Sequence, residues 1–197
     1  MDLPLAGDPD ELALQRAGFA AMLRGDVVTP TELGSRAGLD NHRADEAFAK
    51  LRERGSVTVT DDGRVDGIAG LTVLPTRHRL TVDGHQSHTW CAFDSVGIPA
   101  AIGADAVAVT SCGHCGERIE VRFTAGRTAS TGLWGWVPAL VPDGTDLLGT
   151  FCSAADLFCS REHLDRWHEA AGRPDGAARS LDELMDLGRA TWAHCTG

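Results

Sequence analysis

The order of two kinds of hydrophobic periodicity constrains the fold of this chain more than any other feature. Apolar residues recur at helical spacing in three short stretches, at about 10–23, 29–38 and 41–54. From Val57 onward, strand-like alternation dominates in several short runs. Because helices and strands do not alternate regularly, the pattern predicts an α+β fold rather than a doubly wound parallel sheet.

The first part of the chain, residues 1–69, has the order of a winged helix-turn-helix. Three short helices precede a hairpin whose turn is Asp61-Asp62-Gly63. The third helix carries Asp45 and Glu46 beside Arg43, and acidic side chains are poorly suited to a phosphate-lined groove. We therefore expect a winged-helix-like domain with a structural or dimerising use, and DNA binding is the weaker alternative.

The second part, residues 70–197, is predicted to be a mixed-strand core domain with flanking helices. Short strand-like runs are found at 71–74, 78–82, 106–109 and 119–123, and near 134–140. Helical patterns are found around 99–102, 160–171 and 181–194. The segment 67–70, which begins and ends with glycine, is the predicted junction between the two parts.

The net charge is −10, from 18 basic and 28 acidic side chains. An acidic balance repels a phosphate backbone, so nucleic acid is disfavoured as a partner. No apolar run reaches the roughly 18 to 20 residues of a membrane helix, and the first ten residues lack the pattern of a signal peptide. We expect a cytoplasmic protein without a membrane partner.

The sequence has six cysteines, which are irregularly spaced and too few for a disulfide scaffold. In a reducing compartment they are expected to be thiols, metal ligands or nucleophiles. They lie at positions 91, 112, 115, 152, 159 and 195.

Cys91 and Asp94 stand three residues apart before an apolar stretch, so they share one face of a helical turn. On spacing alone, a buried cysteine with a capping aspartate is the favoured interpretation of this pair, and a functional site is the alternative. A carboxylate held in an apolar pocket, however, has a raised pKa and can carry a proton to give away.

Cys152 and Cys159 belong to a second apolar segment. Cysteine is among the most buried residue types, so each of them taken alone indicates core packing. Two thiols brought together in space would instead suit a soft, thiophilic metal ion.

Cys112-Gly113-His114-Cys115 is the most conspicuous short motif. Thioredoxin-like oxidoreductases carry such a motif at the start of a helix, but here a strand-like run follows it, which predicts the tip of a hairpin. A structural zinc ion at Cys112 and Cys115 would need two further ligands, and no second CxxC exists. We therefore expect a turn without metal, with zinc and redox chemistry as weaker alternatives. Cys195, near the end of the sequence, is expected to be exposed.

Four motifs together resemble one known family. They are Gly70-Leu71-Thr72, Trp90-Cys91-Ala92-Phe93-Asp94, the stretch Ile98–Gly103 and the pair Phe151-Cys152. In type, order and spacing they are similar to the bacterial organomercurial (alkylmercury) lyases, over about residues 19–167. Cys112 also matches a family cysteine that is usually considered structural.

The resemblance implies protonolytic cleavage of the carbon–mercury bond of R–Hg⁺ to R–H and Hg²⁺. In such lyases the equivalents of Cys91 and Cys152 capture the mercury, and the equivalent of Asp94 accepts thiol protons and then protonates the carbon. Cys91, Cys152 and Asp94 are thus the predicted catalytic and mercury-contacting residues. Thiolates bind soft mercury well, and the reaction needs no organic cofactor, so none is expected.

The implied partners are an organomercurial substrate, low-molecular-weight thiols that remove the product, and a mercuric reductase. Cys115 and Cys159 are extra to the family pattern, and no role is assigned to them or to Cys195. The alternative function is a non-enzymatic thiol protein with a winged-helix domain that binds or senses soft metals.

Overall fold

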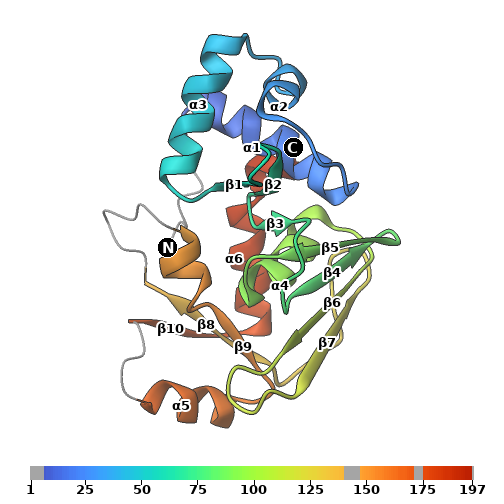
Figure 1. Cartoon of the computed structure of the whole chain (residues 1–197). Helices are drawn as coiled ribbons and strands as arrows, with labels where there is room; N and C mark the ends of the chain where they lie inside the picture. Colours follow the sequence, from blue (N-terminus) through green and yellow to red (C-terminus); the bar gives the residue numbers. More distant parts are fainter. Residues whose placement is uncertain (1–6, 140–146, 171–174, 197) are drawn as a thin grey trace.

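The computed structural model describes residues 7–139, 147–170 and 175–196. It is an α+β structure, as predicted, with two antiparallel sheets and helices that cover and separate them. Figure 1 shows the helices within residues 9–53 at one end of the molecule, the helix of residues 161–169 at the opposite end, and the helices of residues 92–102 and 181–191 between them. Within the described residues, no helix is both long enough and apolar enough to cross a membrane.

The three N-terminal helices form where the sequence predicts them, because each begins with a side chain that caps its free amides. Asp8 and Asp40 accept hydrogen bonds from amides of the first turns, and Thr29 forms a capping box with Glu32. The helices are α1 (Pro9–Leu23), α2 (Pro30–Arg36) and α3 (Asn41–Glu53). The hairpin that follows them is also confirmed.

Seven strands form the larger sheet, in the order β1-β2-β3-β5-β4-β6-β7 with every pairing antiparallel. They are β1 (Val57–Val59), β2 (Val65–Ile68), β3 (Leu71–Thr72), β4 (Arg79–Val82), β5 (His85–Thr89), β6 (Ala106–Ser111) and β7 (Arg118–Phe123). The β2–β3 pairing continues the sheet across the junction at residues 69 and 70. The division into domains 1–69 and 70–197 stays a prediction.

The smaller sheet has three antiparallel strands in the order β10-β8-β9. They are β8 (Trp134–Pro138), β9 (Asp156–Phe158) and β10 (Gly176–Ser180). The predicted mixed-strand core is therefore two sheets that pair only antiparallel among the described residues. The expected strand near 134–140 ends at Pro138, and Leu140 lies outside the described residues.

The other helices lie around this second part of the chain. They are α4 (Ala92–Ile102), the π-helix η1 (Leu147–Cys152), α5 (Arg161–Glu169), α6 (Leu181–Thr191) and α7 (Ala193–Thr196). The helices predicted around 99–102, 160–171 and 181–194 are confirmed as α4, α5 and α6. The polar segment before Cys91, which lies in none of the predicted strand-like runs, forms the strand β5. Ser87 and Thr89 of this strand point inward and are buried. Because both are polar, the strand shows no hydrophobic alternation in the sequence.

Helix α4 is held against α6 at two facing glycines. A Cβ placed on Gly188 would lie 2.3 Å from the Cα of Gly97, so neither position has room for a side chain. Trp192, just after α6, is buried and donates a hydrogen bond from its indole N–H to the Ala69 carbonyl at 2.8 Å. This close packing holds the N-terminal end of α4 beside the β2–β3 turn.

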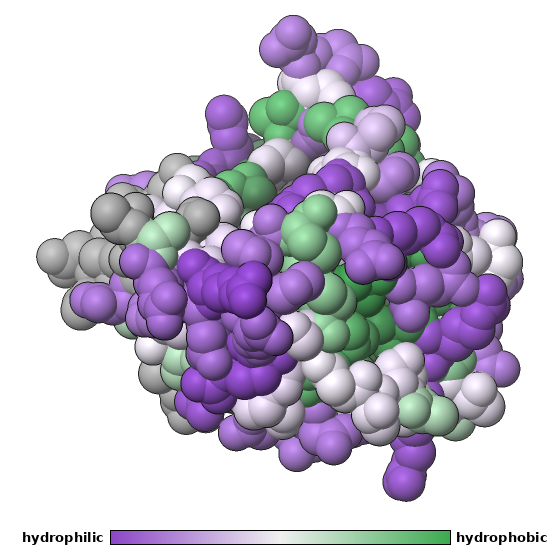
Figure 2. Space-filling view, turned by 90° about the horizontal axis from the view of Figure 1, so that it is seen from below, coloured by the Kyte–Doolittle hydropathy of each residue, from purple (hydrophilic) through white to green (hydrophobic). Residues whose placement is uncertain are grey.

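Hydrophilic side chains cover most of the surface seen from below in Figure 2, and hydrophobic side chains show in a hollow near its centre and in smaller groups in the upper part of the view. The apolar residues form one continuous core that includes Cys91, Cys112 and the buried residues of α4 and α6. The sequence pattern thus leads to a single core whose interior contains two of the six cysteines.

Candidate active site

Cys91 and Asp94 form the first turn of α4. Cys91 is the N-cap residue, and its amide donates a hydrogen bond to Asp94 Oδ2 at 2.9 Å. Thr89, at the end of β5, donates a hydrogen bond from its hydroxyl to the Cys91 carbonyl at 3.0 Å. The helix start therefore orients a thiol and a carboxylate toward each other, as their spacing predicts.

Cys152 reaches this pair from a distant part of the chain. It ends the π-helix η1, and the neighbouring Phe151 packs edge-on against Phe93 of α4 with ring centroids 6.1 Å apart. The donor atoms of Cys91, Asp94 and Cys152 all lie within 4.8 Å of one another. The structure thus brings together the three residues predicted as the site, which we call the buried site.

Burial is the main cause of the pKa shifts in the buried site. Desolvation raises the pKa of Asp94 from 3.8 to about 7, although hydrogen bonds from the Cys91 thiol and from the Cys91 and Trp90 amides lower it. Desolvation also raises the pKa of Cys91 well above 9.0, and the neighbouring Cys152 thiol and Asp94 carboxylate add to this effect. The raised pKa is the direction expected for a carboxyl group in an apolar pocket, and it allows Asp94 to carry a proton near neutral pH.

The β2–β3 turn closes the buried site from one side. Ala69 and Gly70 both have positive φ angles, of 52° and 89°, as a two-residue hairpin turn requires. A Cβ on Gly70 would lie 3.1 Å from Asp94 Cγ, so the absence of a side chain lets the turn approach the carboxylate. Cys91 is fully buried and Cys152 partly exposed, so the site is more accessible on the Cys152 side.

A second group of donors lies elsewhere in the fold and consists of Cys112, Cys115, Cys159 and His163. We call this group the surface cluster, because Cys115 is exposed and Cys159 and His163 are partly exposed. The predicted hairpin tip at Cys112 and Cys115 is confirmed, since β6 and β7 pair on either side of it. Sequence reasoning missed Cys159 and His163 as partners, although their Cys-x₃-His spacing was a usable signal.

The environment of the surface cluster shifts the pKa values of its thiols in different directions. Burial alone would raise the pKa of Cys112, but amides of Cys115, Cys159 and His114, together with the His163 ring, lower it below its usual value. Desolvation, and then the two neighbouring thiols, raises the pKa of Cys159. One cysteine of the cluster is therefore disposed to ionise before another.

Comparison of the sequence with known proteins identifies its family. The family model for alkylmercury lyase (MerB) matches residues 71–193. The chain belongs to the alkylmercury lyase family. An alkylmercury lyase of Bacillus cereus is 31% identical over 84% of this chain and 74% of its own length. One from Pseudomonas putida is 30% identical over 81% and 74%.

A solved structure has the same fold. The mercury-bound form of MerB2 superposes with a TM-score of 0.86 at 23% identity, covering 94% of this chain and 91% of that chain. Because 94% of this chain is covered, the structural similarity includes most of both sheets and of the N-terminal helices. At this identity the likeness shows the fold.

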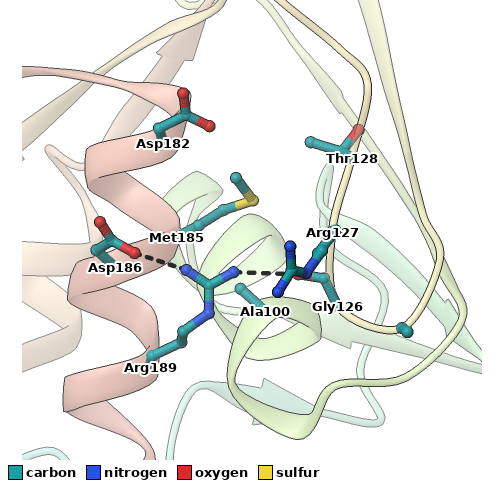
Figure 3. A pocket seen from close by; sticks show the side chains of 9 residues that line it. Ala100, Gly126, Arg127, Thr128, Asp182, Met185, Asp186 and Arg189 are labelled. Carbon is teal, nitrogen blue, oxygen red and sulfur yellow. Dashed lines mark hydrogen bonds and ion pairs between the residues drawn. The ribbon is translucent and has the colours of Figure 1, made fainter.

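Two remaining features of this alkylmercury lyase family member lie outside the buried site. Cys195, predicted to be exposed, is instead partly buried in α7, with its sulfur 3.2 Å from His194 Nε2. A pocket between α6 and the 125–128 loop is lined by charged side chains, among which Arg189 binds Asp186 and the Gly126 carbonyl (Figure 3). Its lining includes no cysteine, so it offers no thiol to a soft metal.

Proposed function

We propose that this chain cleaves the carbon–mercury bond of organomercurials by protonation, with Cys91, Cys152 and Asp94 as the reacting residues. The single observation that carries the proposal is that two thiols and one carboxylate lie within 4.8 Å of one another. Thiolates are preferred ligands of soft metals. A buried carboxyl group with a raised pKa is suited to accept and donate a proton near neutral pH.

Capture of the substrate begins at Cys152, the more accessible of the two thiols. Its sulfur replaces the thiolate that accompanies R–Hg⁺ in solution, and the Cys152 proton leaves with that thiol. The bound metal then favours ionisation of Cys91, as coordination to a metal deprotonates a thiol. Asp94 accepts the Cys91 proton, since the carboxylate and the thiol are hydrogen-bonded.

Cleavage follows when Asp94 returns that proton to the carbon. The electron pair of the C–Hg bond forms the new C–H bond, R–H leaves, and Hg²⁺ stays on the two thiolates. Asp94 is again a carboxylate, so the charges balance. Burial of Cys91 and Asp94 excludes water from the reacting atoms, which strengthens the interaction between the acid and the developing carbanion.

Release of Hg²⁺ requires other thiols, because the two cysteines hold the product. We propose that low-molecular-weight thiols perform this exchange and pass the ion to a mercuric reductase. Such an exchange needs a reducing compartment, and we propose that the reaction takes place in the cytoplasm.

The N-terminal helices and hairpin are proposed to be a winged-helix-like scaffold rather than a DNA reader. Arg43, the cation at the start of α3, forms an ion pair with Asp10 of α1, with Nε 2.9 Å from Oδ2. Lys50 on the same helix pairs with Asp8 at 2.7 Å. Two of the three cations of α3 are thus engaged within the protein, and the helix also carries Asp45 and Glu46, so α3 is poorly equipped to neutralise phosphates.

Hydrocarbon release tests the function. The protein is incubated with phenylmercury and excess thiol, and benzene is measured by gas chromatography. We expect catalytic release from the wild type and from Cys195→Ser, whose thiol lies outside the buried site, and none above background from Cys91→Ser. Equal release from the wild type and Cys91→Ser would overturn the proposal.

A further inference from the structure

The surface cluster brings four donors from two separate parts of the chain to one point. Cys112 and Cys115 lie in the turn between β6 and β7, and Cys159 and His163 lie at the start of α5. Figure 1 shows this turn beside α5 at the lower end of the molecule. The alkylmercury lyase reaction proposed above uses none of these four residues.

The sulfur–sulfur distances from Cys159 to its two neighbours match those of ligands around one tetrahedral ion, and all four donor atoms of the surface cluster lie within 4.8 Å of one another. Cys159 Sγ lies 3.7 Å from Cys112 Sγ and 3.8 Å from Cys115 Sγ. Four bonds of about 2.3 Å at tetrahedral angles place neighbouring sulfurs about 3.8 Å apart. His163 Nδ1 lies 3.7 Å from Cys112 Sγ, close to the roughly 3.6 Å expected between a nitrogen and a sulfur ligand of one tetrahedral ion. It lies 3.0 Å from Cys159 Sγ, a hydrogen-bonding distance, so this pair would move apart by about 0.5 Å to bind the ion.

The backbone of the β6–β7 turn has the form of a zinc knuckle. The Gly116 amide donates a hydrogen bond to the Cys112 carbonyl at 2.9 Å, and Gly116 has a φ of 74°, which glycine adopts without strain. The Cys112 amide in turn donates to the Glu117 carbonyl at 2.8 Å. The turn thereby presents two cysteine side chains on one side.

The second pair of donors is positioned by the start of α5. Ser160 caps the helix by accepting a hydrogen bond from the His163 amide at 3.2 Å, and Cys159 stands immediately before the cap. A further backbone bond, from the Gly113 amide to the Leu157 carbonyl at 3.0 Å, joins the turn to β9. The two pairs are therefore held together by the fold itself.

Core packing does not account for this cluster. Cysteines in protein cores are buried, whereas Cys115 is exposed and Cys159 and His163 are partly exposed. Three thiols and an imidazole form the Cys₃His set of structural zinc sites, in which four protein ligands leave no open position.

We propose that Cys112, Cys115, Cys159 and His163 bind one structural Zn²⁺ ion that ties the β6–β7 turn to the start of α5. Binding releases the three thiol protons and requires His163 to carry its remaining proton on Nε2. The ion closes a segment of chain that includes Cys152, so it also steadies one wall of the buried site. This proposal departs from the expectation of a metal-free turn and does not depend on the lyase proposal.

Metal analysis of the purified protein tests the zinc site. The chain is expressed with zinc in the medium, purified under reducing conditions without chelator, and analysed by mass spectrometry of its metals. We expect one zinc per chain in the wild type and in Cys195→Ser and Cys91→Ser, whose thiols lie outside the surface cluster. Cys115→Ser and His163→Ala should hold much less than one equivalent.

Two further measurements use the wild type alone, so they remain decisive if a variant fails to fold. Cobalt substituted for zinc should show the strong visible bands of a tetrahedral ion together with thiolate charge transfer. Removal of zinc by a chelator should expose three additional reactive thiols and lower Tm by several degrees. These results do not depend on hydrocarbon release, so the zinc site and the lyase function can fail separately.

Three outcomes would overturn the proposal. Wild-type protein without stoichiometric zinc under these conditions is the first. A disulfide between Cys159 and Cys112 or Cys115 in freshly reduced protein, seen as two missing thiols without metal, is the second. The third is zinc that persists in both Cys115→Ser and His163→Ala.

Discussion

The buried site and the surface cluster show how cysteine can serve two kinds of chemistry in one small chain. The buried site has two thiols and the carboxyl of Asp94, and Cys91 and Asp94 are both nearly inaccessible to solvent. The surface cluster has three thiols and His163, with no carboxylate among its donors. An incomplete ligand set beside a proton carrier permits bond cleavage, whereas a complete set of four favours retention of an ion.

The largest expected difference between the two groups is in turnover. Replacing either thiol of the buried site, as Cys91→Ser or Cys152→Ser, should reduce hydrocarbon release at least about a thousandfold, since two thiolates must polarise the C–Hg bond. Cys115→Ser should remain within a few-fold of the wild type, because Cys115 belongs to the surface cluster. The turnover of the three variants is measured as the steady-state rate of benzene release from phenylmercury. A loss in Cys115→Ser as large as in Cys152→Ser, with the protein still folded, would contradict this division of roles.

Asp94→Asn separates capture from cleavage. The amide keeps the size of the side chain but cannot donate the proton, so release should fall about 10²- to 10⁴-fold. The two thiols remain, so the variant should still bind phenylmercury at one equivalent per chain, as measured by mass spectrometry of the intact complex. Turnover at the wild-type rate would remove Asp94 from proton transfer.

The stability of the protein should depend on pH through Asp94. Its pKa is raised from 3.8 to about 7 in the folded protein, so between these values the folded state holds a proton that the unfolded state has lost. The carboxyl therefore destabilises the fold as pH rises from about 4 to about 7, by an amount that reaches about 4 kcal/mol at pH 8. Asp94→Asn should therefore raise the free energy of unfolding, measured in urea, at pH 8 and change it little at pH 4. A gain of equal size at both pH values would show that the cause is not ionisation.

Gly70→Ala, with Gly63→Ala as its matched control, tests the contact between the β2–β3 turn and Asp94. Both glycines have positive φ, 89° and 80°, so an alanine should cost each about 1–2 kcal/mol of strain. A Cβ at Gly70 would press on Asp94, whereas one at Gly63 meets nothing within 4 Å. Gly70→Ala alone should then lower kcat, by about ten- to a hundredfold. Equal kcat values in the two variants would mean that the turn does not position Asp94.

Local signals in the sequence were enough for the three N-terminal helices and for two of the three residues of the buried site. The capping residues Asp8, Thr29 and Asp40 mark helix starts that the structure confirms. Likewise, Cys91 and Asp94 are three residues apart, so a helical turn is sufficient to bring them together. Cys152 joined them only through the resemblance to the family, because no local pattern relates residues on different elements.

The polar strand β5 and the surface cluster were missed for the same physical reason. The inward residues of β5, Ser87 and Thr89, are polar, so hydrophobic alternation does not reveal them. Cys159 and His163 meet Cys112 only because α5 follows β9 and β9 lies against the β6–β7 turn. Contacts of this kind depend on tertiary packing, which a search for local ligand spacings does not detect.

The isotope content of the released hydrocarbon tests the central claim most directly. The wild-type protein is incubated with phenylmercury and excess thiol in D₂O, and the benzene is analysed by mass spectrometry. Because the proton on Asp94 comes from exchangeable thiols, we expect benzene carrying one deuterium, and no release above background from Cys91→Ser. Benzene without deuterium, or deuterated benzene at the same rate from Cys91→Ser, would contradict protonation of the carbon at the buried site.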